Sequence, residues 1–95
     1  MLNNQDETNL NDLLVEEALK VPGIKSVMFL NEDENQNKIF IIENTPKRLE
    51  FRIKISVNVG INVSTIVREY SDLISNTLIK KHKRVKPIVF IGKAF

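Results

Sequence analysis

The residues of this chain that could carry out chemistry are few and lie far apart. The only histidine, His82, lies within the run Lys80-Lys81-His82-Lys83-Arg84. We expect an exposed, solvated side chain, because no second histidine or spaced carboxylate completes a metal site. The serines have no base in a recognisable motif, and the three glycines are too widely spaced for a phosphate-binding loop. The sequence therefore predicts no enzyme and no cofactor.

Metal binding also finds little support. Glu32, Asp33 and Glu34 are consecutive, without the alternating ligands and the turn glycine of a calcium loop, so they indicate a solvated loop. The chain has no cysteine, which excludes disulfides, zinc–thiolate sites and iron–sulfur clusters. We expect neither a metal site nor a small-molecule substrate.

A basic segment is the strongest electrostatic feature. It holds five cations in seven residues, at Lys80, Lys81, Lys83, Arg84 and Lys86. One interpretation is a patch for nucleic acid or anionic lipid, which Arg52 and Lys54 could extend. The other is a helix end stabilised by cations, followed by a solvated turn. No aromatic residue lies within the segment, which disfavours a stacking platform for single strands.

The length and charge distribution indicate one soluble domain. Ninety-five residues with 42% hydrophobic and 27% charged residues are typical of a single small globular domain. Residues 1–34 hold eight acids and two bases, whereas residues 35–95 hold four acids and twelve bases. This asymmetry predicts an acidic arm and a basic body that suits an anionic partner. So small a core also favours association with a second copy.

The N-terminal third predicts a tail and a helix. Residues 1–8 are polar and acidic, so we expect a flexible tail and no signal peptide, with the domain spanning residues 9–95. A helix follows from an Asn9 cap to the Pro22-Gly23 stop. Its apolar stripe recurs at spacings of three and four: Leu10, Leu13, Leu14, Ala18 and Val21.

Three strands are predicted next. Residues 24–30 form a short one, and the run 39–42 indicates a second that is buried on both faces. Residues 49–59 alternate strictly between apolar and polar, which predicts a long strand with one face on the core and Arg52 and Lys54 in water. Gly60 ends this strand in a tight turn.

The last third predicts a helix and a strand. Asn62 is the expected cap of the second helix, and residues 85–91 form the final strand. The order is α-β-β-β-α-β, an α+β fold with two helices packed on one face of a three- to four-stranded sheet. The final strand is apolar on both sides, so Ile88 and Phe90 belong either to the core or to a partner surface.

One segment resembles a bacterial family. The residues Val57-Asn58-Val59-Gly60-Ile61-Asn62-Val63, followed by Ile66-Val67-Arg68, resemble the turn and helix of the alkaline shock protein family of low-GC bacteria. The Val21-Pro22-Gly23-Ile24 turn is also similar to the family's pattern, so the resemblance covers residues 10–91. Val59 and Ser64 stand where the family has tyrosine and proline, and Lys83-Arg84-Val85 replaces its usual helix-to-strand junction.

The resemblance implies a non-enzymatic cytoplasmic protein of envelope or stress homeostasis. Such proteins act by protein–protein interaction: they self-associate, and some sit at the membrane through an envelope partner. The resemblance assigns a role only to Gly60 and Asn62, as structural turn residues, because the family has no catalytic residues. The alternative, from the residues alone, is a small RNA- or ribosome-binding module that uses the segment from Lys80 to Lys86.

Overall fold

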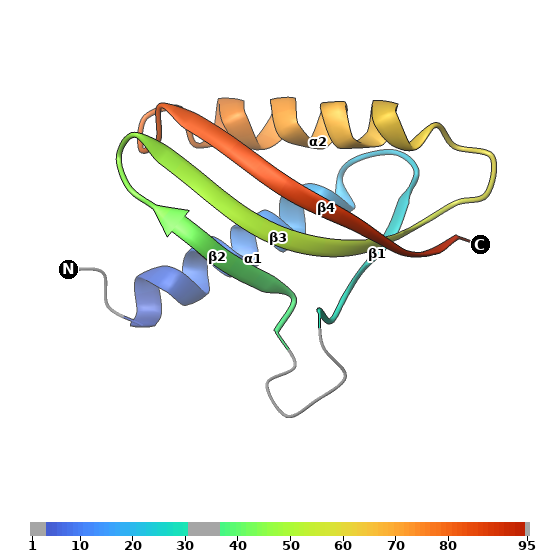
Figure 1. Cartoon of the computed structure of the whole chain (residues 1–95), viewed down its shortest axis with the longest axis horizontal. Helices are drawn as coiled ribbons and strands as arrows, with labels where there is room; N and C mark the ends of the chain where they lie inside the picture. Colours follow the sequence, from blue (N-terminus) through green and yellow to red (C-terminus); the bar gives the residue numbers. More distant parts are fainter. Residues whose placement is uncertain (1–3, 31–36, 95) are drawn as a thin grey trace.

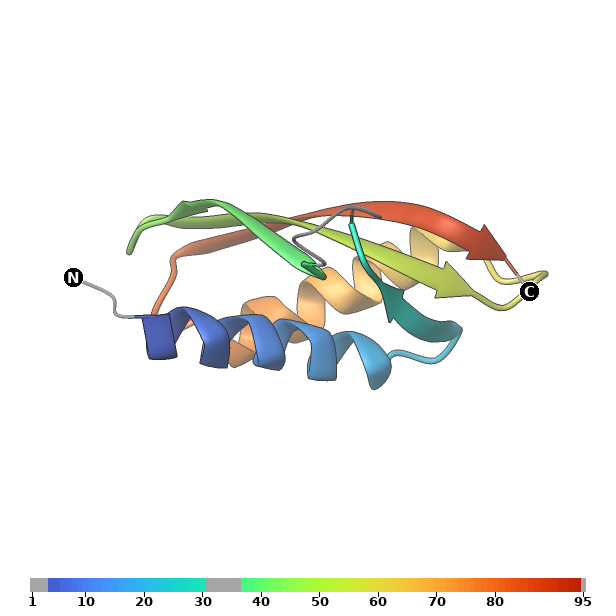
Figure 2. The same cartoon turned by 90° about the horizontal axis from the view of Figure 1, so that it is seen from below.

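The computed structural model describes residues 4–30 and 37–94. Two helices, α1 (Asn4–Leu19) and α2 (Val63–Thr77), and four strands follow the predicted order (Figure 1). The strands are β1 (Ile24–Met28), β2 (Ile39–Asn44), β3 (Arg48–Val57) and β4 (Arg84–Ala94). Figure 2 shows both helices on one side of the sheet and none on the other. The predicted α+β class, with its order of elements, is confirmed.

β3 is the centre of a mixed sheet. One of its edges pairs in parallel with β4 over the whole strand, from Arg48 opposite Arg84 to Val57 opposite Ala94. The other edge pairs antiparallel with β2 in its first half and with β1 in its second half. β1 and β2 therefore lie end to end along the same side of β3 (Figure 1). The parallel pair arises because α2 carries the chain back to the start of β3.

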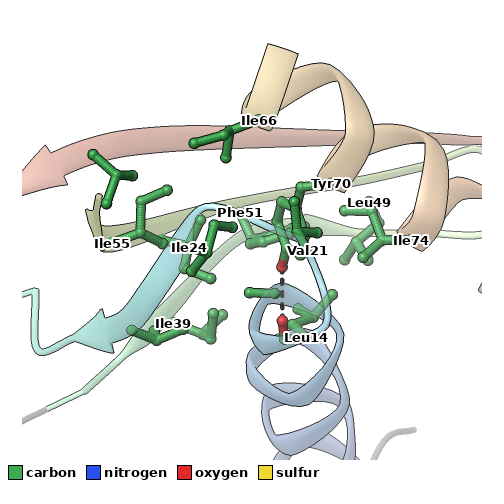
Figure 3. Packing of buried hydrophobic residues seen from close by; sticks show 14 of the residues in the cluster. Leu14, Val21, Ile24, Ile39, Leu49, Phe51, Ile55, Ile66, Tyr70 and Ile74 are labelled. Carbon is green, nitrogen blue, oxygen red and sulfur yellow. Dashed lines mark hydrogen bonds between the residues drawn. The ribbon is translucent and has the colours of Figure 1, made fainter. Parts of the chain in front are cut away.

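The alternation of β3 sets the core. Leu49, Phe51, Ile53, Ile55 and Val57 are all buried, whereas Arg52 is exposed. Lys54, which was predicted to lie in water, is half-buried, and Ser56 on the same face is buried. The buried apolar residues of β3 pack against the helices through Leu14, Ala18, Ile66, Tyr70 and Ile74 (Figure 3). The predicted register is therefore confirmed, because a slip of one residue would exchange the two faces.

Tyr70 joins the two helices inside this core. Its hydroxyl donates a hydrogen bond to the carbonyl oxygen of Leu14 at 2.8 Å (Figure 3). Its ring meets Phe51 edge-on, with the centroids 6.3 Å apart. Burial raises the pKa of Tyr70 above its usual range, and the nearby Glu17 carboxylate adds to the rise. The hydroxyl is thus held protonated as a structural donor.

Several predicted boundaries were wrong. β1 ends at Met28 rather than at residue 30, β2 extends to Asn44 rather than 42, and β4 extends to Ala94 rather than 91. α1 begins at Asn4 rather than after an Asn9 cap. Of the predicted tail, residues 1–3 lie outside the described residues, as do 31–36 of the predicted acidic loop. β3 ends at Val57 instead of Val59, since the next backbone N–H donates to the Gly23 carbonyl and leaves the sheet.

The predicted turn residues have the expected geometry. Gly60 has φ of +89°, a conformation that glycine adopts without strain. Asn62 caps α2: its Oδ1 accepts a hydrogen bond from the backbone N–H of Thr65 at 3.3 Å. Together they turn the chain from the sheet into the helical layer.

β2 differs from its prediction. Ile39 is buried, but Phe40 and Ile42 are exposed, so the strand is not covered on both faces. The apolar run predicted a doubly covered strand, whereas the two helices cover only one face of this sheet. The exposed side chains of Phe40 and Ile42 therefore lie on the side of the sheet that the helices leave uncovered.

Candidate functional site

The structure corrects the prediction for His82. The side chain is buried, with 8% of its surface exposed, instead of solvated. Its Nδ1 donates a hydrogen bond to the carbonyl oxygen of Thr45 at 2.7 Å, in the turn between β2 and β3. This bond assigns the proton to Nδ1, because a carbonyl oxygen only accepts. His82 is thus an anchor for the basic segment, and its place in a charged run hid this role.

Two backbone bonds continue this anchorage. The N–H of Lys83 donates to the Pro46 carbonyl at 3.0 Å, and the N–H of Arg84 donates to the Lys47 carbonyl at 3.2 Å. Three consecutive residues of the basic segment are therefore fastened to the same turn. Their backbone is ordered before any ligand arrives, unlike that of a solvated connection.

The anchored segment helps to form a basic hollow of about 590 Å³. We use this name for the depression between the start of β4 and the last turn of α2, whose charged lining residues are Arg48, Lys83, Arg84 and Lys86. Lys80 and Lys81 do not line it, although the sequence groups them with the others. Arg48, which sequence reasoning missed, joins because its strand starts directly opposite Arg84.

The second candidate region is the bare side of the sheet, here called the open face. Cross-strand pairing places Phe40 and Ile88 on either side of Arg52, and Phe90 beside Lys54. Phe40 is 51% exposed and Phe90 46% exposed, whereas Ile88 is half-buried. Of the two possibilities left by the sequence, Ile88 and Phe90 thus lie outside the core; the neighbouring Val89 packs against it.

Part of the open face is concave. An aromatic hollow of about 480 Å³ is lined by Leu30, Phe40, Arg52, Lys54, Phe90 and Ile91. The Arg52 guanidinium lies over the Phe40 ring, 5.7 Å from its centroid, in a cation–π contact. Aromatic rings and cations therefore do meet in this protein, although no aromatic residue lies within the basic segment. Sequence reasoning missed Phe40 because its run predicted full burial.

Other chemistry finds no support within residues 4–30 and 37–94. These residues contain no cluster of three or more metal-ligating side chains. In the same part of the chain, no helix is both long and apolar enough to cross a membrane. The basic segment and the open face each contribute to a concave surface, the basic hollow and the aromatic hollow.

Comparisons with known proteins give the chain no family. No protein-family model matches the sequence, and no match was found among curated proteins or solved structures. Its function must therefore be argued from the open face and the basic hollow.

Proposed function

We propose that this chain is a non-enzymatic protein of the alkaline shock type, which acts by protein–protein interaction in envelope and stress homeostasis. The observation that carries the proposal is the open face, where Phe40, Ile88 and Phe90 are left uncovered by the helices. Aromatic side chains beside arginine, in a concave surface, have the composition of protein interfaces. The resemblance of residues 57–68 to that family adds the cytoplasmic location and the attachment to the envelope through a partner.

The contact uses the face of the sheet rather than its edge. β4 is an edge strand, and edge strands invite pairing with another chain. This one carries Lys86, then Pro87 without an N–H, and an irregularity where Gly92 is skipped in the register. Lysine, proline and bulges are the devices that prevent edge pairing.

A second copy is the occupant that we propose. β3 and β4 together hold six basic residues and one acid, whereas α1 holds five acids and no base. Two open faces in contact would bring Arg52 and Lys54 of both copies together, with like charges repelling. The exposed Asp12 and Glu16 of α1 offer a complementary surface. The open face of one copy therefore packs on the α1 side of the next.

Sedimentation velocity across a wide concentration range tests this proposal. The wild type should grow in mass with concentration, with or without RNase treatment, and less so at high salt. Phe90→Lys should remain a monomer, and D12K/E16K should do the same because it changes the opposite surface. Val59→Lys is the matched control, since it also places a lysine at an exposed apolar position but lies away from the open face. A wild type that stays monomeric throughout would contradict self-association.

A further inference from the structure

The charge of the basic hollow is largely unopposed. Arg48 contacts Glu50, with Nη2 and Oε1 2.7 Å apart, whereas Lys83, Arg84 and Lys86 form no ion pair with any described residue. The hollow itself has no acidic lining residue. A concave surface lined by one sign of charge focuses the field and attracts the opposite charge. The basic hollow is thus prepared for an anion.

The pairing of β3 with β4 concentrates this positive charge. Arg48 and Arg84 are direct partners across the two strands, so two guanidinium groups project from neighbouring positions. Like charges placed opposite each other destabilise a sheet. Glu50 forms an ion pair with Arg48 and lies opposite Lys86 across the strands, whereas Arg84 forms no ion pair with a described residue. An anion bound between the strands would relieve the repulsion at Arg84.

The negative end of α2 does not cancel this attraction. The Ile74 carbonyl accepts the N–H of Leu78, and the Leu78 carbonyl accepts the N–H groups of Lys81 and His82, each at 3.0 Å or less. The partial charge at a helix C-terminus is only about −0.5, so the four cations of the hollow outweigh it. Ser75 and Asn76 line the same wall and add a hydroxyl and an amide donor.

We propose that the basic hollow binds the phosphate groups of a phosphate chain, either a nucleic-acid backbone or the polyphosphate tail of a nucleotide. Arginine and lysine donors match phosphate oxygens, and the three bonds to the β2–β3 turn hold the backbone that carries them. Apart from the His82 imidazole, no aromatic ring lines the hollow, so the phosphates are recognised and the bases are not. This site goes beyond the proposed function, because it requires neither self-association nor the aromatic hollow.

The test uses the full-length protein and two probes. Fluorescence anisotropy in low-salt buffer measures the binding of a short, labelled single-stranded uridine oligonucleotide. Isothermal titration calorimetry measures the binding of inorganic tripolyphosphate, which is also added as a competitor in the anisotropy experiment. K83Q/R84Q should weaken binding of the oligonucleotide by about tenfold or more. It should also lower the salt slope by about 1.4, since each contact to single-stranded phosphate contributes about 0.7. Circular dichroism verifies that the variant is folded.

K80Q/K81Q is the matched control. It removes the same charge from the same basic segment, but at positions outside the hollow, and should leave binding nearly unchanged. If tripolyphosphate displaces the oligonucleotide, both phosphate sources fit. Binding of the oligonucleotide alone identifies the backbone as the ligand, and binding of tripolyphosphate alone identifies the nucleotide tail.

Three results would overturn the proposal. The first is that neither probe binds at low salt. The second is an equal loss in K80Q/K81Q, which indicates non-specific attraction. The third is that R52Q/K54Q, which changes the aromatic hollow, weakens binding while K83Q/R84Q leaves it unchanged. Phe90→Lys, which disrupts the proposed association, should leave phosphate binding intact, so failure of one proposal does not imply failure of the other.

Discussion

His82 Nδ1 and the carbonyl oxygen of Thr45 lie 2.7 Å apart, and their hydrogen bond joins the start of β4 to the turn between β2 and β3. The residues are distant in sequence, so the bond closes a long loop that includes β3 and α2. It also aligns Lys83 and Arg84 with the strand that begins at Arg48. One buried imidazole thus connects the sheet topology to the basic hollow.

We predict that His82 stabilises the fold mainly through this hydrogen bond rather than through the bulk of its ring. His82→Ala should lower the free energy of unfolding by about 1–3 kcal/mol, because a buried polar interaction is lost. His82→Asn should recover part of this, since its amide N–H can donate from nearly the position of Nδ1. Urea denaturation of the three proteins measures both effects. Equal destabilisation by Asn and Ala would show that packing, not the bond, matters.

Tyr70 should make the protein sensitive to alkaline pH. Burial and then Glu17 raise its pKa in the folded state, while the unfolded chain ionises near pH 10. Above pH 10 the unfolded state therefore binds fewer protons than the folded state. The stabilising contribution of the protonated Tyr70 is complete below pH 10 and is lost as the pH rises further. The expected loss is about 1.4 kcal/mol per pH unit.

Tyr70→Phe provides the comparison. It removes the hydrogen bond to Leu14, at a cost of about 1 kcal/mol near neutral pH, and with it the titrating hydroxyl. The slope of stability against pH above 10 should therefore be shallower in the variant than in the wild type. Parallel slopes would contradict a buried, protonated Tyr70.

The two faces of β3 should respond oppositely to truncation. Ile55→Ala leaves a cavity in the core and should cost about 2–5 kcal/mol, a large part of the stability of so small a domain. Arg52→Ala on the open face should change stability by about 0.5 kcal/mol or less. Chemical denaturation distinguishes them, and a larger effect for Arg52 than for Ile55 would overturn the register.

The cap of α2 makes a smaller contribution. Asn62→Ala should cost about 1 kcal/mol, because the Thr65 N–H loses its acceptor, whereas Asn62→Asp should retain the bond. Asn58→Ala is the control: it is an exposed asparagine of the same connection, and no side-chain hydrogen bond of Asn58 is seen in the structure. Thermal unfolding gives the comparison, and equal losses for Asn62→Ala and Asn58→Ala would argue against capping.

Periodicity was sufficient to predict the fold but not the site. The alternation from Leu49 to Val57 and the apolar stripes of the helices report which faces are buried, and these were predicted correctly. The Asn62 cap and the Gly60 turn depend on local chemistry and were also predictable. Such features are local, so a single sequence carries them.

The parts that were missed depend on pairing between distant segments. Phe40 reaches Arg52, and Arg48 reaches Arg84, only because β2 and β4 pair with opposite edges of β3. His82 is buried against the turn that contains Thr45, 37 residues earlier in the sequence. A local pattern of charge contains no signal for such contacts. Burial of β2 was overestimated for a related reason, since its apolar run does not reveal how many faces the helices cover.

Photo-crosslinking in living cells tests the central claim, that the open face is the contact surface, most directly. A photoreactive residue placed at Phe90 should give a covalent adduct containing a second copy, or else an envelope protein, as identified by mass spectrometry. The same residue at Val59, also exposed but away from the open face, should give little adduct. Phe90 adducts should decrease when D12K/E16K replaces the wild-type α1 surface. Equal adducts at Phe90 and Val59, or none at Phe90, would contradict the account.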